Sequence, residues 1–199
     1  HRGYAELHPV VPPRTAVRRV LIFFGGTDPE NLTGRALSAA LSLARRDMSI
    51  DVVLSVSSPY SREVEALAGP HPQVTCHRNL STLAPLIASA DLALGSPGAT
   101  SWERLCLGLP TIAISMAMNQ NEVAAALHHA GLVDWIAHSD SVTREAIAAR
   151  LKYTLEREDL SVWSAKCREV CDGLGTERTI KEMHDIGELQ SSVLRAATD

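Results

Sequence analysis

The segment DLALGSPGATSWERLCLGLP, residues 91–110, predicts a strand, a glycine-containing loop and a helix in immediate succession. The apolar run at 92–94 has the composition of a buried parallel strand. The loop at 95–99 interrupts this run, and residues 100–107 follow with helical periodicity. Free backbone N–H groups and a helix dipole at such a loop attract anions, so the segment predicts a phosphate site.

The remaining sequence extends this pattern over most of the chain. Apolar segments predict six strands, at 19–24, 50–56, 73–76, 92–94, 111–114 and 132–136. Helical periodicity occurs at about 32–44, 61–68, 80–90, 100–107, 119–130, 142–155, 162–171 and 177–194. The first of these helices has Asp28 as its expected N-cap and Pro29 at its first position. Alternation of this kind predicts an α/β, Rossmann-like, doubly wound parallel sheet with additional C-terminal helices.

Length and composition restrict the class of protein. The chain has 199 residues, 45% of them hydrophobic and 21% charged, which is typical of one globular domain. We assign residues 19–199 to this domain and residues 1–18 to a linker. The formal net charge of −4 disfavours nucleic acid as a partner. No apolar run approaches the roughly 20 residues of a transmembrane helix, so we expect a cytoplasmic protein.

The cysteine and histidine patterns indicate neither a metal site nor a cofactor. Cys76, Cys106, Cys167 and Cys171 form no CxxC pair, and no HExxH motif is present. We expect the four thiols to be small core residues in a reducing compartment.

Three loops are expected to meet at one edge of the sheet. In the common strand order 3-2-1-4-5-6, the first and fourth strands are neighbours, and ligands bind beyond their carboxyl ends. The loops after these strands are 25–29 and 95–101, and both contain glycine. The loop after the fifth strand, which carries Asn119 and Gln120, lies next to them.

Each of these loops has a structural alternative to ligand binding. The first loop, GGTDP at 25–29, is not the dinucleotide pattern GxGxxG, and Asp51 lies at the start rather than the end of its strand, which disfavours NAD. The structural alternative for this loop is a tight turn with Asp28 as the helix cap. Glu103 either completes a capping box with Thr100 or accepts hydrogen bonds from a ribose.

The other polar residues considered for the site also have two alternative roles. Asn119 and Gln120 either begin a helix or bind sugar hydroxyls. No Arg or Lys lies in the two glycine loops, so phosphate charge would be balanced by backbone dipoles, with Arg104 or Arg78 as possible contributors. Trp102 is expected in the core.

The segments FGGTDPENLT (24–33), ADLALGSPGATSWERLCLGLP (90–110) and NQ (119–120) resemble one family. It is the UDP-sugar hydrolase family of pseudaminic acid biosynthesis, within the GT-B superfamily. More distantly, the chain is similar to the C-terminal half of the N-acetylglucosaminyltransferase that makes lipid II. The resemblance implies one half of a two-domain GT-B fold, with the sugar bound between the halves.

The resemblance also implies roles for individual residues. Glu103 would hold the ribose, backbone near Leu80 the uracil, and Asn119 and Gln120 the sugar, with Asn119 supporting catalysis. The two glycine loops would bind the diphosphate through Gly25, Gly26, Thr27, Ser96, Gly98, Ala99, Thr100 and Ser101.

The implied reaction is hydrolysis of a UDP-diacetamido-trideoxyhexose to UDP and the free sugar, in nonulosonic acid biosynthesis. No histidine lies in the three loops, so the base that activates water is expected in the N-terminal domain of the same protein. The alternatives are the donor-binding domain of a GT-B glycosyltransferase and a stand-alone nucleotide-sugar binding domain.

Overall fold

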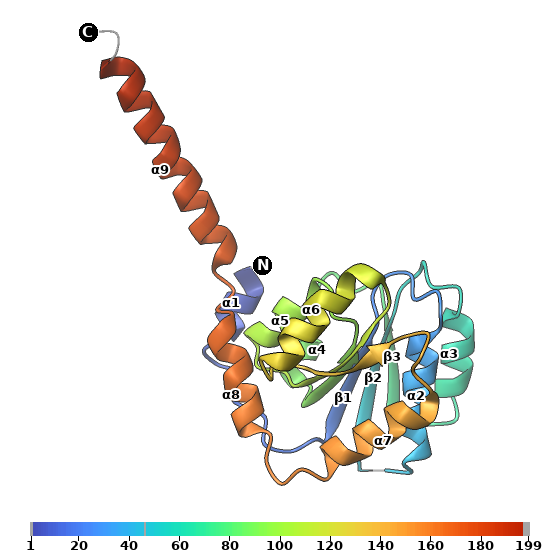
Figure 1. Cartoon of the computed structure of the whole chain (residues 1–199). Helices are drawn as coiled ribbons and strands as arrows, with labels where there is room; N and C mark the ends of the chain where they lie inside the picture. The colour runs from blue at the N-terminus through green and yellow to red at the C-terminus, as the bar shows by residue number, and fades with distance from the viewer. Residues whose placement is uncertain (1, 46, 197–199) are drawn as a thin grey trace.

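The computed structural model describes residues 2–45 and 47–196, with side chains described as far as Ile186. Within these residues, six parallel strands form one sheet between two layers of helices (Figure 1). The strands are β1 (Arg19–Phe23), β2 (Ser49–Leu54), β3 (Val74–Arg78), β4 (Leu92–Gly95), β5 (Thr111–Ser115) and β6 (Asp134–His138). Their order is β3-β2-β1-β4-β5-β6, and every neighbouring pair is parallel. The predicted fold class and strand order are confirmed.

The helices cover both faces of this sheet. They are α1 (Arg2–Leu7), α2 (Leu32–Ser42), α3 (Ser61–Ala68), α4 (Ala84–Ser89), α5 (Thr100–Cys106), α6 (Met118–His129), α7 (Arg144–Leu155), α8 (Ser161–Val170) and α9 (Gly175–Ala196). Side chains of α2, α3 and α7 pack in one core cluster, whereas α4, α5, α6 and α8 contribute to clusters on the opposite face. The edge of the sheet at the carboxyl ends of its strands is therefore left to the loops.

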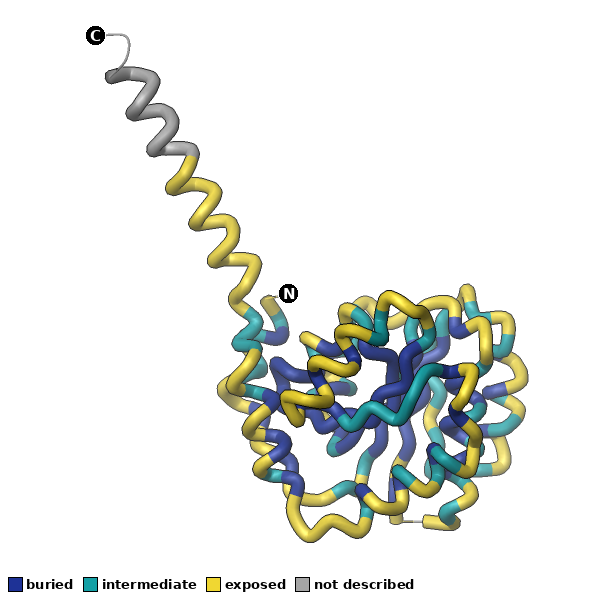
Figure 2. The backbone as a smooth tube through the Cα atoms, viewed as in Figure 1, coloured by how far each residue is buried: buried dark blue, intermediate teal, exposed yellow. Residues whose placement is uncertain are grey.

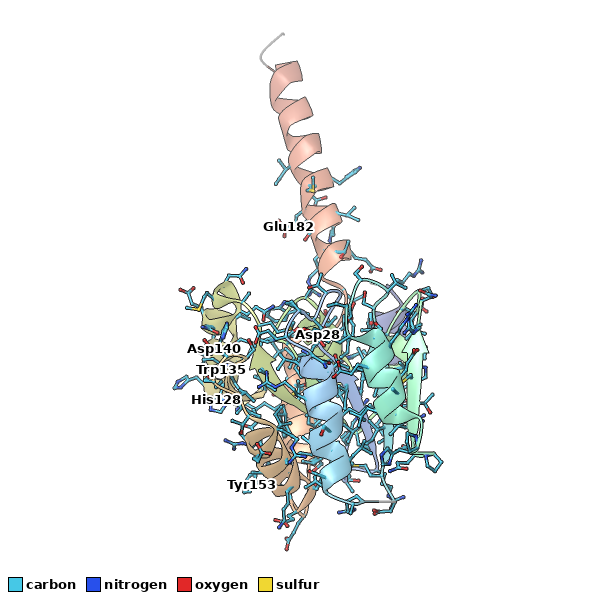
Figure 3. All side chains as sticks on the ribbon, turned by 90° about the vertical axis from the view of Figure 1, so that its right-hand side faces the viewer. Asp28, His128, Trp135, Asp140, Tyr153 and Glu182 are labelled. Atoms are coloured by element: carbon cyan, nitrogen blue, oxygen red, sulfur yellow. The ribbon has the colours of Figure 1, made fainter. Side chains whose placement is uncertain are left out.

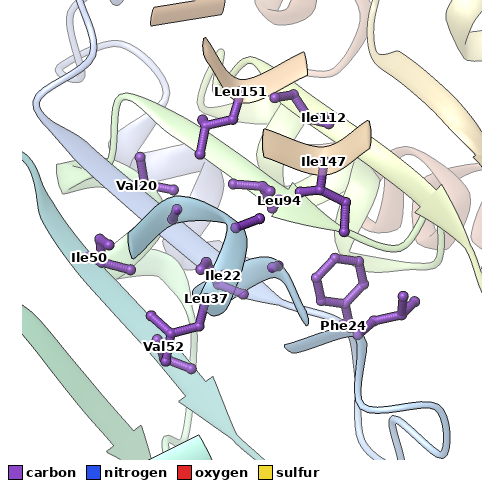
Figure 4. Packing of buried hydrophobic residues seen from close by; sticks show 14 of the residues in the cluster. Val20, Ile22, Phe24, Leu37, Ile50, Val52, Leu94, Ile112, Ile147 and Leu151 are labelled. Carbon is purple, nitrogen blue, oxygen red and sulfur yellow. The ribbon is translucent and has the colours of Figure 1, made fainter. Parts of the chain in front are cut away.

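Alternation along the strands divides the core between the two faces. In β1, Val20 and Ile22 pack with Leu37 of α2 and Ile147 of α7 (Figure 4). Leu21 points to the other face and packs in the cluster that contains α4 and α5 residues. Burying each of these side chains stabilises the fold by about 1.5–3 kcal/mol. A continuous apolar strand is needed here because both faces are covered.

The first helix after β1 begins later than the sequence predicts. Asp28 and Asn31 have positive φ angles of 39° and 52°, so the chain turns twice before α2 starts at Leu32. Pro29 consequently lies in the loop and not at the first helical position. Asn31 is the N-cap, and its side chain accepts a hydrogen bond from the N–H of Gly34 at 3.0 Å.

Two further elements have shifted boundaries. The helix expected from residue 80 starts only at Ala84, where the Thr82 hydroxyl accepts a hydrogen bond from the Ala84 N–H at 3.2 Å and Pro85 fixes the first turn. Residues 79–83 are left as a loop. The sixth strand starts at Asp134 instead of residue 132, because Leu132 is buried in the turn after α6.

The expectation that Trp102 is a core residue is wrong. The buried side of α5 carries Ser101, Arg104, Leu105 and Cys106, while Trp102 lies on the other side and is 49% exposed. Helical periodicity does not reveal that this face of α5 is uncovered.

The four cysteines are free thiols, and they differ in burial. Cys106 and Cys167 are core residues, as expected, whereas Cys76 and Cys171 are only half-buried. Burial raises the pKa of Cys106 to about 11 and that of Cys167 to about 12. Both thiols are therefore protonated near neutral pH.

The N-terminal segment packs on the domain. Tyr4 of α1 is buried, and the ring of His8 lies 2.6 Å from the carbonyl oxygen of Cys106. Arg14 is buried and donates hydrogen bonds to the carbonyl oxygens of Ala90 at 3.0 Å and Ile87 at 2.7 Å, and also to Leu107. The described side chains of α9 are exposed along the part that projects from the body (Figure 2).

Arg14 provides a test of this attachment. Arg14→Ala removes the donor from several buried carbonyl oxygens, so we expect the free energy of unfolding to fall by about 3 kcal/mol. Urea unfolding followed by circular dichroism measures the change. Arg2→Ala is the matched control, because Arg2 is exposed and pairs only with Glu6 at 3.4 Å, and it should cost less than about 0.5 kcal/mol. Equal losses in the two variants would contradict the anchoring role of Arg14.

Candidate functional site

A pocket of about 400 Å³ lies at the carboxyl ends of β1, β2 and β3, beside the first turn of α5. Gly26, Leu80, Thr100 and Glu103 line it, and each was predicted as a site residue. Its size is within the range of small-molecule sites. The remaining lining residues are Tyr4, Phe23, Val53, Leu54, Ser55, Val56, Asn79, Ser81, Thr82 and Leu83.

Glu103 lines the pocket without capping its helix, and its carboxylate shares a hydrogen bond with the Tyr4 side chain. The N-cap of α5 is Ala99, and no side chain caps the helix by hydrogen bonding. The capping-box alternative for Glu103 and Thr100 is therefore wrong. Instead, the carboxylate lies near the phenol of Tyr4. Burial raises the pKa of Tyr4, and the negative charge of Glu103 raises it further.

The second loop is held by hydrogen bonds from a buried arginine. Arg104 donates hydrogen bonds to the carbonyl oxygen of Ser96 at 2.7 Å and to the hydroxyl of Ser101 at 3.1 Å. A Cβ on Gly95 would lie 2.5 Å from the carbonyl oxygen of Phe23 and would collide with the Arg104 guanidinium. Glycine is required at residue 95 because the arginine passes so close to the end of β4.

The charge of Arg104 is almost fully enclosed. The residue is 3% exposed, its Nε atom has no partner, and no carboxylate of the described residues is within ion-pair distance. Burial lowers its pKa to about 10, although Glu103 acts in the opposite direction. The side chain therefore remains a cation at neutral pH, directly beneath the second loop.

Backbone donors of the second loop remain free, whereas its serine groups are used internally. The amide of Ser101 donates to the carbonyl oxygen of Gly98 at 2.9 Å, and the amide of Trp102 donates to that of Ala99 at 3.3 Å. Among the described residues, nothing accepts from the amides of Gly98, Ala99 and Thr100. The buried Ser101 hydroxyl and the Ser96 carbonyl both accept from Arg104, so neither of these two groups is free for a ligand.

The first loop uses its carboxylate for structure. Asp28 is 2% exposed, and its two oxygens accept hydrogen bonds from the amides of Leu32 at 2.8 Å and Thr33 at 2.9 Å. It therefore stabilises the start of α2, although it is not the N-cap itself. Open space lies beside both Gly25 and Gly26, and Gly25 has a φ of 96°. Figure 3 shows Asp28 at the N-terminal end of α2.

The third loop meets the second as predicted, through Gln120. Its side-chain oxygen accepts from the N–H of Met116 at 2.8 Å, and its nitrogen lies 3.8 Å from where a Cβ on Gly98 would be. Asn119 is exposed in the first turn of α6. The predicted site residues that do not line the pocket of Glu103 are Gly25, Thr27, Ser96, Gly98, Ala99, Ser101, Asn119 and Gln120.

Some lining residues were not predicted. Tyr4 comes from the segment interpreted as a linker, and no signal in the sequence links it to the pocket. Ser81 and Thr82 fall in the helix expected from residue 80, although Pro85 indicated a later start, and Asn79 lies just before it. Arg78, considered for phosphate binding, pairs with Glu65 at 2.6 Å and does not line the pocket.

Neither a metal cluster nor a membrane-spanning helix is found in the described part of the chain. No group of three or more His, Cys, Asp or Glu residues there could hold a metal ion. None of the helices there has the length and apolar character needed to cross a bilayer.

Comparison with known proteins finds relatives that share part of their length with this chain. No family model matches it. An uncharacterised protein of Methanocaldococcus jannaschii is 36% identical over 109 residues, which cover 53% of this chain and 22% of that protein. The spore coat polysaccharide biosynthesis protein SpsG of Bacillus subtilis is 24% identical over 86% of this chain and 51% of its own length. The chain thus spans about half or less of the curated relatives it matches.

Solved structures define the class of fold. MurG of Acinetobacter baumannii matches 92% of this chain with a TM-score of 0.67 and 18% identity, over 53% of its own length. The spinosyn rhamnosyltransferase SpnG complexed with thymidine diphosphate matches 85% with a TM-score of 0.63 and 20% identity, over 46% of its length. The fold is a Rossmann-like α/β domain that matches about half of each of these two proteins.

The role of Asp28 can be tested by unfolding. Asp28→Ala leaves two amides at the start of α2 without acceptors, so we expect a loss of about 2 kcal/mol in the free energy of unfolding. Urea titration measures it. Asp140→Ala removes an acid that is largely exposed, and this control should change stability by less than about 0.5 kcal/mol. A loss no larger than that of the control would show that Asp28 is free for another role.

Proposed function

We propose that this chain is the nucleotide-binding half of an enzyme that acts on a UDP-sugar. The uridine would occupy the 400 Å³ pocket, and the diphosphate would lie over the second loop. Residues 19–199 would form this domain, with residues 1–18 leading from an N-terminal domain. The observation that carries the proposal is the position of Glu103, a carboxylate on the pocket wall without a capping role.

The ribose is assigned to Glu103. A carboxylate is an acceptor with two oxygens, which suits the paired hydroxyls of a ribose. The dinucleotide alternative has no equivalent acid at the end of β2. Asp51 lies inside that strand and is held by Arg19 at 2.6 Å and by His77 at 2.7 Å.

The uracil is assigned to the loop at 79–83. This loop carries Leu80, Ser81 and Thr82 along one side of the pocket and is not helical. Backbone groups outside regular structure can donate to and accept from the edge of a base. Leu80 is 41% exposed, so its side chain can also cover an apolar ring.

The diphosphate is assigned to the free amides of Gly98, Ala99 and Thr100. These donors need no cation within the loop itself, because the Arg104 side chain places a positive charge beneath them. A buried cation without a counter-charge is costly, and a bound diphosphate would offset part of that cost. Gly25, Gly26 and Thr27 would border the same anion from the first loop.

The reaction is assigned from the sequence resemblance. Hydrolysis of a UDP-diacetamido-trideoxyhexose would release UDP, with Asn119 and Gln120 near the sugar. The described histidines lie outside the three loops, so the general base would come from the N-terminal domain. The similarity of fold to MurG and SpnG favours a second candidate, transfer of the sugar to an acceptor other than water.

Substitution of Glu103 tests the binding site. Glu103→Gln should weaken UDP binding about 10- to 100-fold in calorimetry, because it removes a charged acceptor worth about 1.5–3 kcal/mol. NAD should bind far more weakly than UDP to the unsubstituted protein. Glu145→Gln, at an exposed acid on α7, is the control and should leave UDP affinity unchanged. If the Glu103→Gln variant bound UDP with unchanged affinity, the assignment of the ribose to Glu103 would be wrong.

Product analysis tests the reaction. We expect the protein, assayed together with its N-terminal domain, to convert UDP-amino-sugars into UDP and free sugar. Chromatography with mass spectrometry distinguishes free sugar from acceptor-linked product. Acceptor-linked product alone would favour the glycosyltransferase, and UDP binding without turnover of any substrate would favour a stand-alone binding domain.

A further inference from the structure

A second pocket, of about 390 Å³, lies between the end of α6, α7 and α8, and we call it the flank pocket. It shares no lining residue with the pocket of Glu103. His128 and Tyr153, which both line it, lie along one edge of the molecule in Figure 3, away from Asp28. Its charged and aromatic residues include Arg150, Arg157, Lys166, Asp134, Tyr153 and Trp163.

The flank pocket is basic in a chain whose formal net charge is −4. Three of its residues are cationic, whereas Asp134 is its one carboxylate. Asp134 pairs with Arg150 at 3.4 Å. Arg157 and Lys166 form no ion pair with any residue that the structure describes. Two cations are therefore available to a ligand.

Arg157 is held in place by an aromatic ring. Its guanidinium lies 5.4 Å from the centre of the Trp163 ring, in a cation–π contact. The indole is itself fixed, because it is buried and its Nε1–H donates to the carbonyl oxygen of Leu132 at 3.0 Å. A guanidinium stacked in this way keeps its in-plane N–H donors for an oxyanion.

Lys166 adds a second donor to the same hollow. It follows Trp163 by three residues on α8, so the two side chains share one side of the helix. Its ammonium lies near Gly131, at the turn that follows α6. Tyr153, which is 61% exposed, contributes a ring that can cover the carbon skeleton of a ligand.

We propose that the flank pocket binds a small multivalent anion, a phosphorylated or polycarboxylated metabolite. Arg and Lys donate charge-assisted hydrogen bonds to oxyanions of both kinds. The volume is large enough for a compact metabolite. The contact of Arg157 with Trp163 restricts the guanidinium before binding, which lowers the entropy cost of fixing that side chain on a ligand.

The test is a titration of the ¹⁵N-labelled protein, with UDP present in excess, followed by NMR. Inorganic pyrophosphate and citrate are the two probes. Either probe should shift the Gly131 amide and the Trp163 indole, which report on the flank pocket alone. If only pyrophosphate shifts these signals, the ligand of the flank pocket is a phosphorylated metabolite. If only citrate shifts them, the ligand is a polycarboxylate. If neither probe shifts these signals, the proposal is wrong.

Variants separate the flank pocket from general charge effects. Lys166→Gln and Arg157→Gln should each weaken binding of the effective probe about tenfold. Lys152→Gln is the matched control on α7, because Lys152 is exposed, pairs with Glu156 and does not line the pocket. Equal weakening in all three would indicate nonspecific screening and overturn the proposal. The assigned signals belong to the flank pocket, so this result is independent of whether UDP binds as proposed.

Discussion

The parallel pairing of β1 with β4 is the constraint on which the site depends. Phe23 and Gly95, the last residues of these strands, are partners in the register. The loops that leave them must therefore diverge from one point, which opens a crevice at the edge of the sheet. Pairing of β4 with β5 then brings Gln120 against Gly98. Three segments distant in sequence become neighbours through two strand pairings.

The two glycine loops differ in the buried charge that stabilises them. In the first, the buried carboxylate of Asp28 satisfies the amides at the start of α2, which leaves that helix end closed to anions. In the second, the buried Arg104 satisfies carbonyl and hydroxyl oxygens of the loop and leaves its amides unpaired. A cation therefore lies beneath the second loop, although neither loop contains a lysine or an arginine.

The N-terminal segment contributes to both stability and site. Arg14 ties the chain to carbonyl oxygens around α4 and after α5, the two helices next to the pocket of Glu103. Tyr4, ten residues earlier, forms part of the pocket wall. Arg168 of α8 donates to the carbonyl oxygens of His8 and Val11 from the other side. A segment with little apolar periodicity is therefore fixed by arginine hydrogen bonds to backbone.

The sequence by itself determined the strands, their order and the meeting of the three loops, because continuous apolar runs and glycine turns are local signals with a small number of compatible topologies. Tertiary structure alone decided which side chains remain uncovered. Helical periodicity could not separate the exposed Trp102 from the buried Arg104, since both lie on α5 and only neighbouring elements distinguish its sides. The same holds for Tyr4 and for the flank pocket, whose residues gather only when β6, α7 and α8 pack together.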